Sequence, residues 1–175
     1  MSRFLRIALG SGLLIASLSG LGVELPQVSG LPTLGLNPSP TVIEAPELTS
    51  LEQQILEQTN AYRQERGLSS LAPSAVITQQ ARLHSEAMSQ QKQLSHDGFE
   101  QRVAAIAQSI RYRRAGENVA FNRGYTNPAT QAVEGWINSP GHRANLEGDF
   151  DLIGIGVTQA SDGSYYFTQV FIKQR

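Results

Sequence analysis

Apolar residues recur at helical spacing in two stretches that follow residue 49. The first helix is predicted to begin at Ser50, an N-cap with Gln53 three residues later, and to end near Gly67. The second is predicted to extend over about residues 74–91. The faces that define these two helices contain Leu51, Ile55, Thr59 and Tyr62, and then Ile77, Ala81, His84 and Met88.

A third amphipathic stretch follows residue 126. Asn127 is predicted to cap this helix, with Pro128 at its first position and the sequence Ser139-Pro140-Gly141 as its stop. Trp136 lies on its apolar stripe and is therefore predicted to be core rather than part of a lipid groove. Glu134 lies off the stripe and is predicted to face solvent. The stripe consists of Ala129, Ala132, Val133, Trp136 and Ile137.

The last part of the chain has the pattern of strands. Residues 152–159 and 165–172 are rich in β-branched and aromatic residues, and a Gly-containing segment separates them. This pattern predicts a β-hairpin. Helices followed by a hairpin predict an α+β fold class, with helices packed on a small antiparallel sheet.

The first 49 residues differ from the rest. Residues 1–22 combine Arg3 and Arg6 with an apolar run that ends in small residues, which predicts a signal peptide; an uncleaved membrane anchor is the alternative. Residues 23–49 hold five of the eight prolines and are predicted to form an extended linker. Residues 50–175 then form the globular domain. It is predicted to be secreted, extracellular or periplasmic, or tethered to the membrane by an uncleaved N-terminus.

Composition narrows the chemistry further. The net charge is −1, so the chain lacks the basic surface that nucleic acid requires, and no nucleic-acid partner is predicted. There is no cysteine, which excludes disulfides, thiolate metal sites and a thiol nucleophile. Any metal would therefore be held by His, Asp or Glu.

Three polar residues are the main candidates for function. His96, Glu117 and His142 fall in sequence typical of turns or element edges. Two imidazoles and a carboxylate suit zinc with one position open for water, although no short metal-binding motif is present. Ordinary hydrogen-bonded polar residues remain the alternative. His84, on the buried stripe, is predicted to be structural, with a pocket-lining role as the alternative.

Several motifs together resemble the CAP superfamily of cysteine-rich secretory, antigen five and pathogenesis-related proteins, in its bacterial cysteine-free branch. The resemblance extends over about residues 51–172. Its motifs are Asn60-Ala-Tyr-Arg63, Ala81-Arg-Leu-His-Ser-Glu-Ala-Met88, Ser95-His96, Gly116-Glu-Asn-Val-Ala120, Trp136-Ile-Asn-Ser-Pro-Gly-His-Arg-Ala-Asn145, Ile153-Gly-Ile-Gly-Val157 and Phe167-Thr-Gln-Val-Phe171.

The resemblance implies an α-β-α sandwich with a central cavity that, in many members, binds a divalent metal such as zinc. His96 and His142 match the two cavity histidines, and Glu117 matches the first cavity glutamate. Ser139 stands where many eukaryotic members carry the second glutamate, so that ligand is missing and Ser139 is at most a pocket liner.

Three functions follow as hypotheses. The first is a non-catalytic binding module whose polar cavity takes a small apolar ligand or an extracellular protein. The second is a metal-dependent hydrolase of extracellular or cell-wall peptides, with Glu117 as ligand or base. The third is a purely structural clamp made by His96, Glu117 and His142. Membrane contact is expected only through an uncleaved N-terminal segment.

Overall fold

The helix that opens the domain, α1 (Ser50–Gln64), starts with a capping box, one residue earlier than predicted. The N-cap is Thr49, whose side chain accepts from the Glu52 N–H while the Glu52 carboxylate accepts from the Thr49 N–H. The computed structural model describes residues 48–175. The predicted signal peptide or anchor and nearly all of the predicted linker lie outside the described residues.

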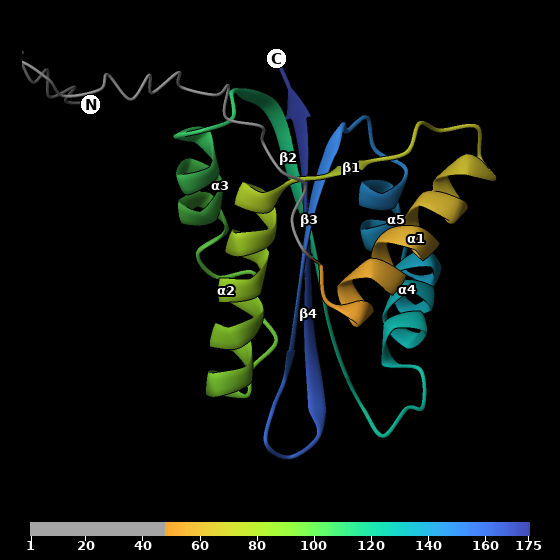
Figure 1. Ribbon diagram of the computed structural model, residues 1–175, viewed down its shortest axis with the longest axis vertical. Coiled ribbons are helices and arrows are strands. Elements are labelled where there is room, and N and C mark those ends of the chain that lie inside the picture. Colours follow the sequence, from red (N-terminus) through yellow and green to blue (C-terminus); the bar gives the residue numbers. More distant parts are fainter. Residues whose placement is uncertain (1–47) are drawn as a thin grey trace, which may run out of the picture. The chain divides into compact units, whose positions relative to one another are not determined.

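A four-stranded sheet forms the middle layer (Figure 1). Its order is β1 (Ala72–Pro73), β3 (Leu152–Gln159), β4 (Ser164–Gln174) and β2 (Tyr112–Arg123). β3 and β4 form the predicted hairpin, and β2 pairs antiparallel with β4 along its whole length. The short β1 pairs parallel with β3, so the sheet is antiparallel except at that edge.

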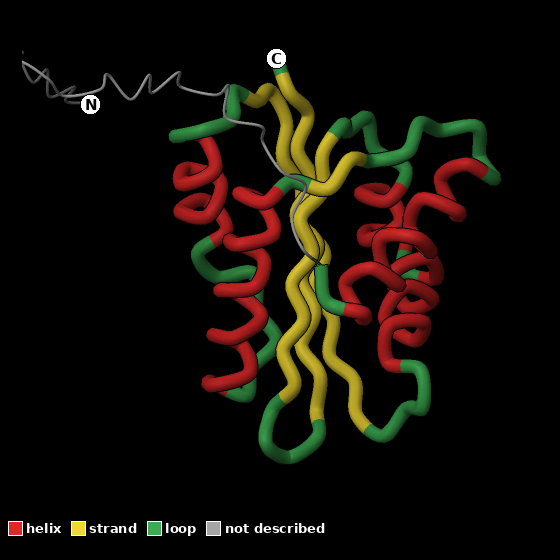
Figure 2. The backbone as a smooth tube through the Cα atoms, viewed as in Figure 1, coloured by secondary structure: helices red, strands yellow, loops and turns green. Residues whose placement is uncertain are grey.

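Helices cover both faces of this sheet (Figures 1 and 2). α2 (Ala75–Gln91) and α3 (Phe99–Ala107) lie on one face, and α1, α4 (Pro128–Asn138) and α5 (Pro140–Leu146) lie on the other. The predicted α+β class and α-β-α sandwich are therefore confirmed. The helices α3 and α5 and the strands β1 and β2 were not predicted, and Ser139-Pro140-Gly141 starts a new helix where it ends the previous one.

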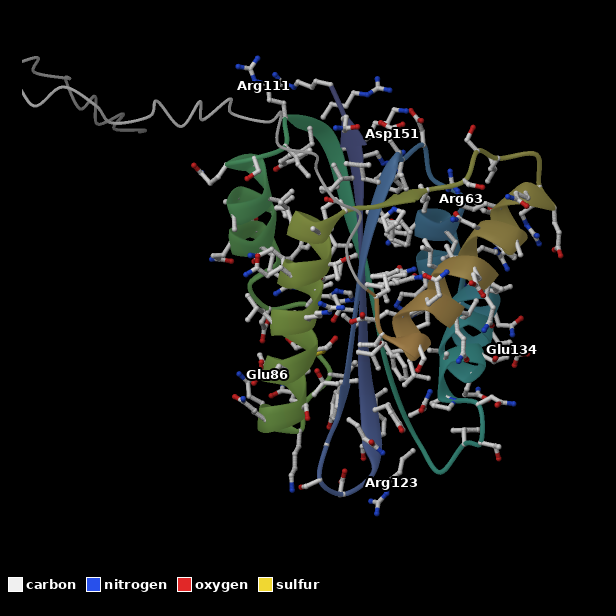
Figure 3. The ribbon with its side chains drawn as sticks, in the orientation of Figure 1. Arg63, Glu86, Arg111, Arg123, Glu134 and Asp151 are labelled. Carbon is white, nitrogen blue, oxygen red and sulfur yellow. The ribbon has the colours of Figure 1, made fainter. Side chains whose placement is uncertain are left out.

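Each helical layer has its own apolar core. Trp136, Phe167 and Phe171 are at most 1% exposed and pack with α1 and α4 on one face. Ile77, Ala81 and Ile106 fill the other face beneath α2 and α3. The core position predicted for Trp136 is confirmed, and its indole N–H donates to the Val119 carbonyl at 3.0 Å. Glu134 is exposed on α4, as predicted (Figure 3).

Candidate functional site

Glu117 lies in the middle of β2. Its carboxylate contacts Arg102 as well as His96. The side chain is 2% exposed and faces the α2–α3 layer. The guanidinium of Arg102, on α3, donates to Glu117 Oε2 from Nε at 2.9 Å and to Oε1 from Nη2 at 2.7 Å. Paired parallel bonds of this kind are the strongest arginine–carboxylate geometry. Both carboxylate oxygens thus have a cationic donor.

His84 completes the buried side of this group. Its Nδ1 lies 3.0 Å from Arg102 Nη1, and its Nε2 lies 2.7 Å from the Ser95 carbonyl. A guanidinium can only donate, so Nδ1 accepts and the ring is neutral, with its proton on Nε2. Burial is the main cause that lowers the pKa of His84, and the neighbouring Arg102 charge acts in the same direction. Both ring nitrogens of His84 thus have hydrogen-bond partners inside the fold.

The same arginine fixes the loop between α2 and α3, residues 92–98. Arg102 Nη1 donates to the Asp97 carbonyl at 2.7 Å, and His84 engages the Ser95 carbonyl. Lys92 and Gly98, at the two ends of the loop, have φ angles of 51° and 74°. We call Arg102, Glu117, His84 and His96 the arginine cluster. Its bonds set the path of the loop that carries Leu94.

His96 and His142 are placed differently from each other. The His96 side chain is 54% exposed, and its Nδ1 lies 2.9 Å from Glu117 Oε1. His142 is on α5 and half-buried; within the described residues, its imidazole has no hydrogen-bond partner. Burial, followed by the nearby His96, lowers the pKa of His142. Glu117 and His142 are therefore in regular elements, whereas the sequence placed them in turns or at element edges.

A second polar network ties the opposite helical layer to β2. Asn145 on α5 donates to the Glu117 carbonyl at 3.1 Å and to Asn118 Oδ1 at 2.9 Å. Asn118 donates in turn to Gln169, which donates to Thr59 on α1. Sequence reasoning assigned no role to Arg102, Asn118 or Asn145. Asn118 and Asn145 belong to motifs that carry the CAP resemblance, whereas Arg102 belongs to none of them.

This donor set does not fit a metal ion. The described residues contain no group of three or more His, Asp or Glu side chains that could hold a metal. The Glu117 oxygens already accept from Arg102, whose positive charge would repel a cation at that position. Without Glu117, two imidazoles remain, fewer than the three protein ligands usual for zinc. The zinc or divalent-cation site inferred from the resemblance thus lacks a fitting set of ligands.

A calorimetric titration with zinc chloride at neutral pH is expected to show no site of micromolar affinity, because Arg102 takes the place of a metal on Glu117. The His142→Ala variant is expected to give the same heats as the unsubstituted protein. A single micromolar site in the unsubstituted protein that disappears in His142→Ala would contradict this expectation.

A groove of about 550 Å³ lies along β2 and is lined by Leu94 of the loop of residues 92–98; we call it the edge groove. Residues 119–123 of β2 form its floor, Leu94 stands on one side, and Gln131, Gly135 and Ser139 of the α4 side stand on the other. Ser139 and His142 therefore line a pocket, whereas His84 is not among the lining residues. Leu94, Phe121 and Tyr125 border the groove, each about half exposed.

Comparison with known proteins places the fold in a family. The model of the cysteine-rich secretory protein (CAP) family matches residues 56–171. The uncharacterized membrane protein YlbC of Bacillus subtilis is 36% identical over 132 residues, which cover 72% of this chain and 35% of YlbC. The uncharacterized protein YkwD of the same organism is 34% identical over 140 residues, which cover 75% of this chain and 51% of YkwD. The chain thus spans between a third and about half of these relatives.

Solved structures show the same fold. An extracellular protein of Bacillus anthracis with an SCP domain is 29% identical, with a TM-score of 0.59, and the match covers 74% of this chain and 45% of that one. An outer surface protein of Borrelia burgdorferi has a TM-score of 0.64 at 20% identity, over 75% of this chain and 98% of that one. With the family model matched over nearly all of the described residues, the chain belongs to the CAP family.

Proposed function

We propose that this CAP domain is a non-catalytic binding module that takes an apolar ligand in the edge groove. One observation carries the proposal. Four large apolar side chains are exposed among the described residues, and three of them, Leu94, Phe121 and Tyr125, border this groove. Exposed apolar side chains that gather around a concavity are typical of a binding site.

The arginine cluster serves this site by positioning it. Arg102 and His84 hold the carbonyls of residues 95 and 97, so Leu94 is kept at the side of the groove. The structural clamp considered as a separate hypothesis is thereby part of the binding module. It is centred on Arg102 and includes His96 and Glu117 of the three residues first considered, whereas the His142 imidazole has no hydrogen bond within residues 48–175 and is not part of it.

The arrangement offers no support for a metal-dependent hydrolase. A metal-bound water would require ligands that Glu117 cannot supply while it accepts from Arg102. A serine hydrolase is not supported either. Ser139 and His142 line the same groove, but the residue after Ser139 is Pro140, which has no main-chain N–H to stabilise the oxyanion that attack by Ser139 would form.

An exported location accompanies this function in our proposal. The Bacillus anthracis relative is an extracellular protein and the Borrelia burgdorferi one is an outer surface protein. None of the helices in residues 48–175 is long and apolar enough to cross a membrane.

Titration with the fluorescent apolar probe anilinonaphthalene sulfonate tests the groove. We expect one site per protein, and about fivefold weaker binding in Leu94→Ser, since loss of roughly half a leucine's burial corresponds to about 1 kcal/mol. Leu83→Ser is the matched control, because Leu83 is an equally exposed leucine (53%, against 48% for Leu94) that lies outside the groove. Equal affinities in the two variants would contradict the proposal.

A further inference from the structure

The edge groove follows a strand that has a partner on one side only. In the sheet order, β2 is the outermost strand next to β4. The Glu117 carbonyl accepts from Asn145 and the Val119 carbonyl accepts from Trp136, both of which lie outside the sheet. Main-chain groups alternate along a strand. The N–H and C=O of Phe121 and Arg123 therefore point away from β4 as well.

From Phe121 onward, the outward carbonyls of β2 no longer accept a hydrogen bond from a side chain of the described helices. Side chains of α4 and α5 donate to the carbonyls of Glu117 and Val119, so these two outward carbonyls are satisfied. Among residues 48–175, no loop or side-chain hydrogen bond reaches the main chain of Phe121 or Arg123. Arg123 lies near the end of the sheet close to the β3–β4 turn (Figure 3). Open strand edges are usually covered or blunted in proteins, because they pair readily with another chain.

The groove has walls from both helical layers at this point. Phe121 contacts Tyr166 edge-to-face at 5.1 Å between ring centroids, which places it on the α2 side of the sheet together with Leu94. Gly135 and Gln131 belong to α4 on the opposite side. A Cβ added at Gly135 would meet no atom within 4 Å, so the wall is open there. The result is a slot that follows the strand edge between the two layers.

We propose that the ligand of the edge groove is an extended peptide segment of another protein, which adds to β2 as a fifth strand. Its main chain would exchange hydrogen bonds with Phe121 and Arg123. Its alternate side chains would lie against Leu94 and Phe121 on one face and over Gly135 on the other. Residues 119–123 span about 16 Å, the length of roughly five residues of strand. This inference rests on the proposed function, since it names the ligand class of the same groove.

Main-chain recognition leaves a signature that side-chain recognition does not. The probe is a peptide selected from a phage-displayed random dodecamer library on the full protein, then synthesised with a fluorescent label. We expect N-methylation at alternate peptide residues to weaken binding by more than about tenfold, the cost of roughly one lost hydrogen bond. Methylation at the intervening residues is expected to have little effect. Loss at every position, or at none, would overturn the inference.

Two protein variants test the slot itself. Phe121→Pro removes the outward N–H, whereas Phe121→Ala removes the ring and keeps the N–H; we expect the proline variant to bind the peptide more than about tenfold more weakly than the alanine variant. Gly135→Leu should fill the slot without disturbing the fold, because leucine favours a helix and meets open space there. Circular dichroism and thermal melting confirm that each variant is folded.

The outcomes separate the inference from the proposed function. If the apolar probe binds in a Leu94-dependent way but no selected peptide is sensitive to Phe121→Pro, the peptide inference is wrong and the apolar groove stands. If the probe shows no Leu94 dependence, the proposed function fails first. A concentration-dependent dimer that Phe121→Pro makes monomeric would show that a second copy fills the edge, and would also overturn the inference.

Discussion

Replacement of Arg102 by leucine is expected to lower the free energy of unfolding by about 3–5 kcal/mol, the range found when one partner of a buried ion pair is removed. The Glu117 carboxylate would remain 2% exposed with two of its hydrogen bonds missing. The Asp97 carbonyl would lose its donor as well. A typical domain is stable by only about 5–15 kcal/mol, so this loss would be readily seen in urea denaturation followed by circular dichroism.

Two controls identify the cause of that loss. Arg113→Leu removes an arginine from an ion pair whose side chains are both more than half exposed, and we expect little change in stability. The double variant Arg102→Leu/Glu117→Leu removes the stranded carboxylate and should recover most of the loss. A double variant less stable than Arg102→Leu would contradict the assignment of Glu117 as the group left unpaired.

The same variant links the cluster to binding. At a temperature where Arg102→Leu remains folded, the loop of residues 92–98 should be less restrained, and Leu94 should be displaced from the groove. We expect the apolar probe to bind this variant more weakly than the unsubstituted protein, although Arg102 does not line the groove. Unchanged probe affinity in a folded Arg102→Leu protein would show that the cluster is purely structural.

Local patterns were sufficient to predict the helices α2 and α4 and the β3–β4 hairpin. Apolar residues that recur every 3.6 or every 2 positions identify a helix or a strand with one buried face, without knowledge of the partner that covers it. Pro128, at the first position of α4, marks the start of that helix by itself. The rule that proline marks the first position of a helix also explains why α5 was not predicted. Pro140 was interpreted only as the stop of α4, but it also occupies the first position of the next helix.

β2 was missed because most of its buried side chains are polar. Glu117 faces one helical layer and Asn118 the other, and both are buried, so the strand lacks the alternation of apolar and polar residues that predicts a half-buried strand. Their burial is compensated by Arg102, Asn145 and Gln169. Those partners come from α3, α5 and β4, and only the tertiary fold brings them together. The candidate residues were visible in the sequence, but their partners were not.

A second large effect is expected at Gly156 on β3, where α2 packs directly on the strand. A Cβ added at this position would overlap the main chain of Ala81 and Arg82. Main chain yields less easily than a flexible side chain, so Gly156→Ala should cost about 3 kcal/mol or more, the upper end for overpacking. Gly135→Ala is the matched control: its Cβ meets no atom within 4 Å, and it should stabilise α4 by about 0.5–1 kcal/mol. Urea denaturation of both variants measures the change in the free energy of unfolding, which should fall in Gly156→Ala and rise in Gly135→Ala.

The consequence of Gly156→Ala should extend to the groove, because α2 carries parts of the clamp. To relieve the overlap, α2 must move away from β3, and Ser85 would then lose its hydrogen bond to the Gly156 carbonyl at 2.9 Å. His84 precedes Ser85 on the same helix and contacts both Arg102 and the loop that holds Leu94. Probe binding should therefore weaken together with stability in Gly156→Ala. If the variant were as stable as the unsubstituted protein, the close packing of α2 on β3 would not be what positions the clamp.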